Sequence, residues 1–102
     1  MAIIKLNASN FQTEVLDSPK PVLVDFYADW CGPCKMVGPL VETLSDESDA
    51  YKVGKINVDE SPELAARYQV MSIPTLIVFA DGKIKQQAVG ARGKEDIRRM
   101  LV

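Results

Sequence analysis

Trp30-Cys31-Gly32-Pro33-Cys34-Lys35 contains both cysteines of the chain, and the stretches on its two sides decide the fold. Before it, residues 22–27 form an apolar run broken only by Asp25, which is typical of a central strand covered on both faces. After it, apolar residues recur at helical spacing over residues 36–44. A Cys-x-x-Cys motif at such a strand-to-helix junction predicts a dithiol redox site.

Strand-like and helix-like stretches alternate along the rest of the chain. Their order, βαβαβαββα, predicts an α/β fold with a parallel core, to which a final hairpin adds antiparallel pairing. Asp81-Gly82 marks that hairpin. The length of 102 residues predicts a single domain, residues 1–102. The predicted strands are residues 3–6, 22–27, 51–59, 75–79 and 83–89, and the predicted helices are residues 11–16, 36–44, 61–68 and 94–102.

Composition argues against several classes of function. The net charge is −2, so no basic surface for nucleic acid or an anionic membrane is expected. No apolar run approaches the roughly 20 residues that span a bilayer, and the first residues lack a signal-peptide pattern, so we expect a cytoplasmic protein. The sequence carries no clear oligomer signal, so a monomer is the default expectation. Two cysteines and no histidine argue against a metal site within one chain, although a metal shared between two chains stays open.

The interpretation of Cys31 and Cys34 that involves no chemistry is a structural disulfide. A disulfide that closes so short a ring stabilises the fold by about 2 kcal/mol at most. In a cytosolic protein the two thiols are also usually kept reduced. The redox interpretation has a mechanism, because unpaired N–H groups at a helix start favour a thiolate at Cys31. Cys34, three residues later, shares that helix face, while Gly32 leaves Cys31 open and Pro33 is tolerated in the first turn.

Three further residues have two interpretations each, and one peptide bond has a single prediction. Asp25 either reaches solvent at the sheet end or is a buried carboxyl that accepts the proton of Cys34. Lys55, on a neighbouring strand, either is solvated or shares the environment of Asp25. Trp30 is either core or an apolar platform for a partner chain. For Ile73-Pro74, the low frequency of cis bonds in folded proteins predicts a trans peptide.

The segment from Val24 to Lys35 resembles the active-site segment of the thioredoxin family. The resemblance continues in one order through the whole chain, in Pro39, in Lys55 and Asp59, in Ile73-Pro74-Thr75-Leu76 and in Val89-Gly90-Ala91. It implies a thioredoxin fold, in which a central mixed sheet of strand order 1-3-2-4-5 carries helices on both faces.

The resemblance also implies roles for the site residues. Cys31 is expected to be the exposed nucleophile and Cys34 the buried resolving thiol, while Lys55 tunes Asp25. Pro74 is expected to be cis and to lie against the dithiol, which overrides the prediction of a trans bond. A partner-binding groove is expected from Trp30, Gly32, Pro33, Ile73, Pro74, Gly90 and Ala91.

Gly32-Pro33 between the cysteines resembles reducing members of the family, and these residues tune the thiolate and hence the redox poise. We therefore predict a protein-disulfide reductase that serves as a general cytosolic electron donor. Its expected partners are disulfide-containing target proteins and a thioredoxin reductase, which supplies the reducing equivalents, so no bound cofactor is expected. Two other classes stay open: a binding module with incidental thiols, and an oxidase or isomerase that differs only in potential.

Three residues depart from the family pattern. Tyr27 stands where many members carry a second tryptophan, which alters packing beside the site but removes no reacting group. Met71-Ser72 replaces a frequent glycine before Ile73, which changes how a partner backbone docks. Asp29 adds a negative charge two residues before Cys31 and opposes thiolate formation slightly.

Overall fold

A computed structural model gives the structure of residues 3–102, and its core is a five-stranded sheet. The strands are β1 (Ile4–Lys5), β2 (Val22–Tyr27), β3 (Lys52–Asn57), β4 (Thr75–Ala80) and β5 (Lys83–Val89). They lie in the order β1-β3-β2-β4-β5. β3 pairs in parallel with both β1 and β2, whereas β4 pairs antiparallel with β2 and β5. The predicted mixed sheet and its strand order are therefore confirmed.

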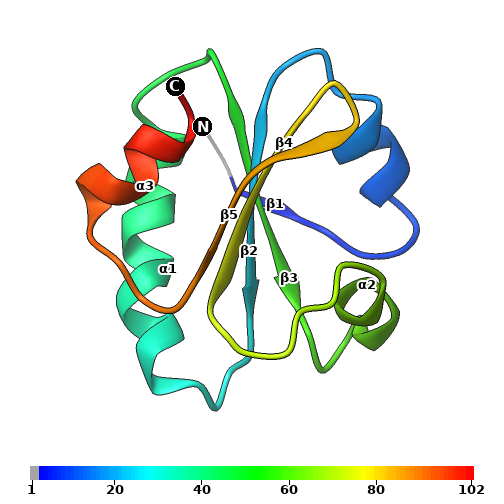
Figure 1. Ribbon diagram of the computed structural model, residues 1–102, viewed down its shortest axis with the longest axis vertical. Coiled ribbons are helices and arrows are strands. Elements are labelled where there is room, and N and C mark those ends of the chain that lie inside the picture. Colours follow the sequence, from blue (N-terminus) through cyan, green and yellow to red (C-terminus); the bar gives the residue numbers. More distant parts are fainter. Residues whose placement is uncertain (1–2) are drawn as a thin grey trace.

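Helices cover both faces of this sheet, as predicted (Figure 1). They are the π-helical segment η1 (Gln12–Leu16), α1 (Gly32–Ser45), α2 (Pro62–Arg67) and α3 (Lys94–Met100). α1 and α3 lie on one face, and η1 and α2 lie on the other. None of the helices formed by residues 3–102 has both the length and the apolar composition needed to cross a bilayer.

The alternation of side chains along β2 divides the core into two layers. Leu23 packs with residues of α1 and α3, including Val37 and Ile97. Val24 and Phe26 point to the other layer, where they pack with residues of η1 and α2. Because side chains alternate along a strand, Asp25 lies on the same face as Leu23, beneath α1. The predicted position of β2 as a strand covered on both faces is confirmed.

Two turns test the local predictions. Asp81 and Gly82 both have positive φ, 55° and 76°, which is the backbone that a two-residue hairpin requires. Ser61 is the N-cap residue before Pro62, the first residue of α2, but its hydroxyl makes no capping hydrogen bond. The side chain of Asn57 orders the turn instead, because its Oδ1 accepts the N–H groups of Asp59 and Glu60 at 2.9 and 3.3 Å.

Candidate active site

A disulfide joins Cys31 and Cys34 where β2 leads into α1, with the two Cα atoms 5.3 Å apart. Cys31 is the N-cap of α1, with an extended backbone, and its Sγ accepts the N–H of Cys34 at 3.2 Å. That N–H is one of the groups that a helix start leaves without a backbone partner. It therefore favours negative charge on the Cys31 sulfur once the disulfide is reduced.

Both cysteines are buried, with only 4% of each residue exposed. The expectation that Cys31 is exposed is therefore wrong for the disulfide form. The reason is local packing: the cysteines form a cluster with Ala28, and Cys31 Sγ lies 3.8 Å from the carbonyl oxygen of Ile73. Gly32 keeps one approach open, since a Cβ atom built there would meet no atom within 4 Å.

Asp25 is buried, with 2% of the residue exposed, so the interpretation in which it reaches solvent is wrong. Its Oδ1 is buried without a hydrogen-bond partner among residues 3–102. Burial raises the pKa of Asp25 from 3.8 to about 7, and the positive charge of Lys55 opposes that rise. A carboxyl with this pKa exchanges a proton readily at neutral pH.

Lys55 on β3 is in register with Asp25 on β2, so the interpretation that places it on a neighbouring strand beside Asp25 is confirmed. It is half-buried rather than freely solvated. Its ammonium nitrogen lies 5.5 Å from the ring centre of Tyr27, within the range of a cation–π contact. This contact was not predicted, although the two-residue spacing of Asp25 and Tyr27 on a strand does place them on one face.

The Ile73–Pro74 peptide bond is cis. The prediction of a trans bond from base rates is therefore wrong, and the expectation from the family resemblance is confirmed. The Pro74 carbonyl accepts the N–H of Gly90 at 2.8 Å, and Gly90 has a φ of 96° that glycine tolerates. These contacts bring the residue 73–74 and 90–91 segments to the same end of the sheet as the dithiol.

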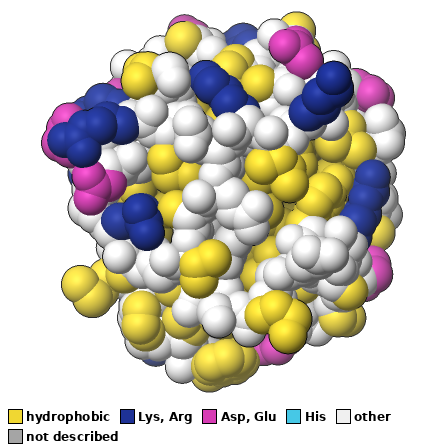
Figure 2. All heavy atoms as spheres, viewed as in Figure 1, with side chains coloured by type: hydrophobic (Ala, Val, Ile, Leu, Met, Phe, Trp, Pro, Cys, Tyr) yellow, Lys and Arg dark blue, Asp and Glu magenta, His cyan; other side chains and the backbone are white. Residues whose placement is uncertain are grey.

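Trp30 is 70% exposed, so the interpretation as a core residue is wrong. Its indole Nε1 donates a hydrogen bond to Asp59 Oδ2 at 2.8 Å. Trp30 and Asp59 are 29 residues apart in the sequence, so no local pattern indicates that they are paired. Among the expectations from the sequence, only the family resemblance names Asp59. Hydrophobic side chains gather along the lower rim of the face in Figure 2, at the end of the sheet where α1 begins in Figure 1.

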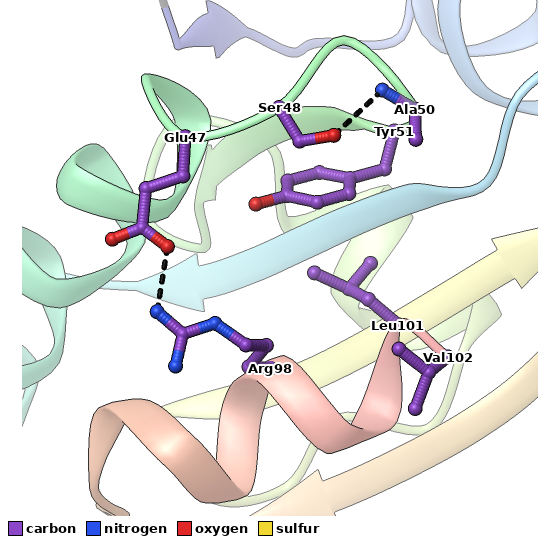
Figure 3. Close-up of a pocket in the computed structure, with 7 residues that line it drawn as sticks. All are labelled: Glu47, Ser48, Ala50, Tyr51, Arg98, Leu101 and Val102. Atoms are coloured by element: carbon purple, nitrogen blue, oxygen red, sulfur yellow. Dashed lines mark hydrogen bonds and ion pairs between the residues drawn. The ribbon is translucent and has the colours of Figure 1, made fainter.

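Residues 3–102 form at least two cavities. One, of about 300 Å³, lies at the far end of α1, where an ion pair joins Glu47 to Arg98 at 2.6 Å (Figure 3). The other, of about 440 Å³, is bordered by α1 and by the loop that precedes α3. Its lining residues are Met36, Leu40, Ala91, Arg92 and Gly93. Within residues 3–102, no group of three acidic or cysteine side chains is placed to hold a metal ion.

Nearly the whole chain is similar to known proteins. The thioredoxin family model matches residues 2–102. A thioredoxin of Mycobacterium tuberculosis is 52% identical over 101 residues, which cover 98% of this chain and 87% of the relative. A thioredoxin of Acidithiobacillus ferridurans is 46% identical over 101 residues, covering 98% and 94% of the two chains.

A third relative, from Mycobacterium leprae, carries the name bifunctional thioredoxin reductase/thioredoxin. It is 48% identical over 99 residues, which cover 96% of this chain and 22% of that protein.

Cys31 and Cys34 are the dithiol–disulfide redox pair of a protein-disulfide reductase. The extent of these matches, together with the sheet order and the position of the disulfide, shows that the chain belongs to the thioredoxin family.

Proposed function

We propose that the protein is a general electron donor that reduces disulfides in target proteins. The observation that carries this proposal is the combination of a redox-active disulfide at the start of α1 and a buried carboxyl, Asp25, beneath that helix. In the first step, the Cys31 thiolate attacks one sulfur of the target disulfide. A mixed disulfide forms, and the other target sulfur leaves as a thiolate.

The second step needs a proton acceptor. Cys34 gives its proton to ionised Asp25, and its thiolate attacks the Cys31 sulfur. The Cys31–Cys34 disulfide forms and the second target sulfur leaves, so the target gains two electrons and the protein loses two. Asp25 passes its proton to the departing target sulfur or to solvent. A pKa of about 7 supports this role, since the carboxyl is then ionised in about half of the molecules at neutral pH.

We infer that a thioredoxin reductase returns the protein to its dithiol form. The support is the Mycobacterium leprae relative, whose name joins a thioredoxin reductase and a thioredoxin in one protein. We further propose a cytoplasmic location, where a reducing system keeps such a dithiol reduced. Targets would dock on a groove formed by Trp30, Gly32, Pro33, Ile73, Pro74, Gly90 and Ala91, with the cis Pro74 against the dithiol.

A coupled assay tests the proposal. The protein, a thioredoxin reductase with its nicotinamide reductant, and a protein with an accessible disulfide are mixed, and consumption of the reductant is followed. The wild type is expected to sustain turnover, whereas the Cys31→Ser and the double Cys31→Ser, Cys34→Ser variants sustain none. Equal turnover by the double variant would overturn the redox role and leave the binding-module interpretation.

A further inference from the structure

We propose that Tyr27 is a positioning residue for the proton transfer, because its ring holds the Lys55 ammonium beside Asp25 and so sets the pH at which Asp25 accepts the Cys34 proton. The inference rests on the proposed role of Asp25. It concerns a residue that takes no part in the covalent chemistry.

The geometry starts from the strands. Asp25 and Tyr27 are two residues apart on β2, so their side chains leave the same face of the sheet. Lys55, in register with Asp25 on β3, leaves that face too. The Lys55 nitrogen lies 5.5 Å from the centre of the Tyr27 ring. Tyr27 is itself half-buried against the cluster of Cys31, Cys34 and Ala28, which fixes the ring at the site.

The ring matters because little else holds the ammonium. A lysine ammonium is strongly hydrated and sits on a flexible stem, so its default is to extend into water. None of the ion pairs formed within residues 3–102 includes Lys55. The negative face of an aromatic ring attracts a cation at this distance and keeps it close to the sheet. Without the ring, we expect Lys55 to move towards solvent and away from the carboxyl.

The other groups around Asp25 do not replace this charge. On β4, its register partner is the apolar Leu76. On β1, Lys5 is in register with Lys55, but its side chain is exposed and pairs with Glu60 at 3.5 Å. The two cysteines at the start of α1 do not titrate as a disulfide, and the charge that acts on the pKa of Asp25 is that of Lys55. Lys55 is therefore the cation whose position changes the ionisation of Asp25 most.

A carboxyl titration tests the proposal directly. The Asp25 side-chain carbon is followed by NMR against pH in the disulfide form, so that thiol titration does not interfere. Tyr27→Leu removes the ring and is expected to raise the Asp25 midpoint by roughly half a pH unit, a fraction of the 1–3 units that an adjacent opposite charge produces. Tyr27→Phe keeps the ring and is expected to stay close to wild type. Equal midpoints for the leucine and phenylalanine variants would overturn the proposal.

The second arm shows whether the effect runs through Lys55. In the Lys55→Met background, Tyr27→Leu is expected to leave the Asp25 midpoint where Lys55→Met alone puts it. A leucine effect that persists in that background would mean that Tyr27 acts by packing alone, and would refute the positioning role. If Tyr27→Leu fails to fold, Tyr27→Met provides the same ring deletion.

The kinetic arm separates this inference from the proposed function. The pH profile for resolution of a mixed disulfide is expected to move with the NMR midpoint in Tyr27→Leu. If Asp25→Ala resolves the mixed disulfide at the wild-type rate at every pH, the role of Asp25 fails, whatever the midpoints show. If Asp25→Ala slows resolution but Tyr27→Leu leaves both the midpoint and the profile unchanged, only the role of Tyr27 fails.

Discussion

Asp25 and Lys55 face each other across β2 and β3, in register, with the carboxyl almost fully buried and the lysine half-buried. Burial dominates the ionisation of Asp25, since its pKa rises to about 7 in spite of the nearby positive charge. An ionised carboxylate in such a place destabilises the fold. The protein therefore keeps a destabilising group on the central strand of its sheet, six residues before Cys31.

The first prediction concerns stability against pH. Between pH 3.8 and about 7, native Asp25 holds a proton that the unfolded chain has released, so the free energy of unfolding falls as pH rises. The loss is complete above the native pKa, and a shift from 3.8 to about 7 corresponds to about 4 kcal/mol. The Asp25→Ala variant lacks this pH-dependent loss of stability. Urea unfolding from about pH 4 to about pH 8 should show the stability of the variant, relative to wild type, increasing by about that amount.

The cavity left by alanine does not disturb this comparison, because its cost does not depend on pH. A wild-type-minus-variant difference that stays constant over the whole range would show that Asp25 has an ordinary pKa in the native state.

The second prediction concerns Cys34. Cys34→Ser leaves the Cys31 nucleophile but removes the sulfur that resolves the mixed disulfide, so the adduct with a target should accumulate. Mass spectrometry of the non-reduced mixture should detect the protein and target joined through Cys31. Cys31→Ser is the matched control and should give no adduct. If the Cys34→Ser variant released reduced target as fast as wild type, Cys34 would not be the resolving thiol.

The third prediction concerns the packing of β1 on β3. A Cβ atom at Gly54 would lie 2.5 Å from Leu6 Cδ1 and 3.2 Å from the Ile4 carbonyl oxygen. Leu6 is buried and has little room to move, so Gly54→Ala should destabilise the fold by about 1–3 kcal/mol. Gly38 in α1 is the control, because a Cβ there meets nothing within 4 Å. Gly38→Ala should stabilise by about 0.5–1 kcal/mol.

Both free energies come from denaturant unfolding at one pH. Gly54→Ala with wild-type stability would mean that β1 lies farther from β3 than the structure places it.

The fourth prediction concerns Trp30. Its exposed ring, held by Asp59, offers an apolar surface beside the disulfide. Trp30→Ala should lower kcat/KM for a protein disulfide about tenfold, or about 1.4 kcal/mol, as expected for an aromatic residue that contributes strongly to binding. Trp30→Phe keeps part of the apolar surface but loses the hydrogen bond, so its loss should be smaller.

Ile84→Ala provides the control, since Ile84 is an exposed hydrophobic residue on β5 near the Asp81-Gly82 hairpin. Equal kcat/KM values for Trp30→Ala and Ile84→Ala in the reductase-coupled assay would remove Trp30 from the docking surface.

The sequence predicted the features that depend on local pattern. The run of residues 22–27, apolar except for Asp25, indicated a strand covered on both faces, and the helical spacing over residues 36–44 placed Cys31 near a helix start. The contacts that shape the site depend on residues far apart in the chain. Ile73 covers the Cys31 sulfur and Asp59 holds Trp30, and no periodicity or capping signal encodes either contact. The cis bond before Pro74 is of the same kind, because tertiary context overrides the usual preference for trans.

The redox potential of the Cys31–Cys34 couple, measured by equilibration with a defined dithiol buffer, decides whether the protein reduces or oxidises its targets. A reductase requires a value near or below the cytosolic glutathione poise, roughly −220 mV or lower, and we expect that result. A value near that of strong oxidants, about −120 mV, would contradict this expectation and reverse the direction of the chemistry.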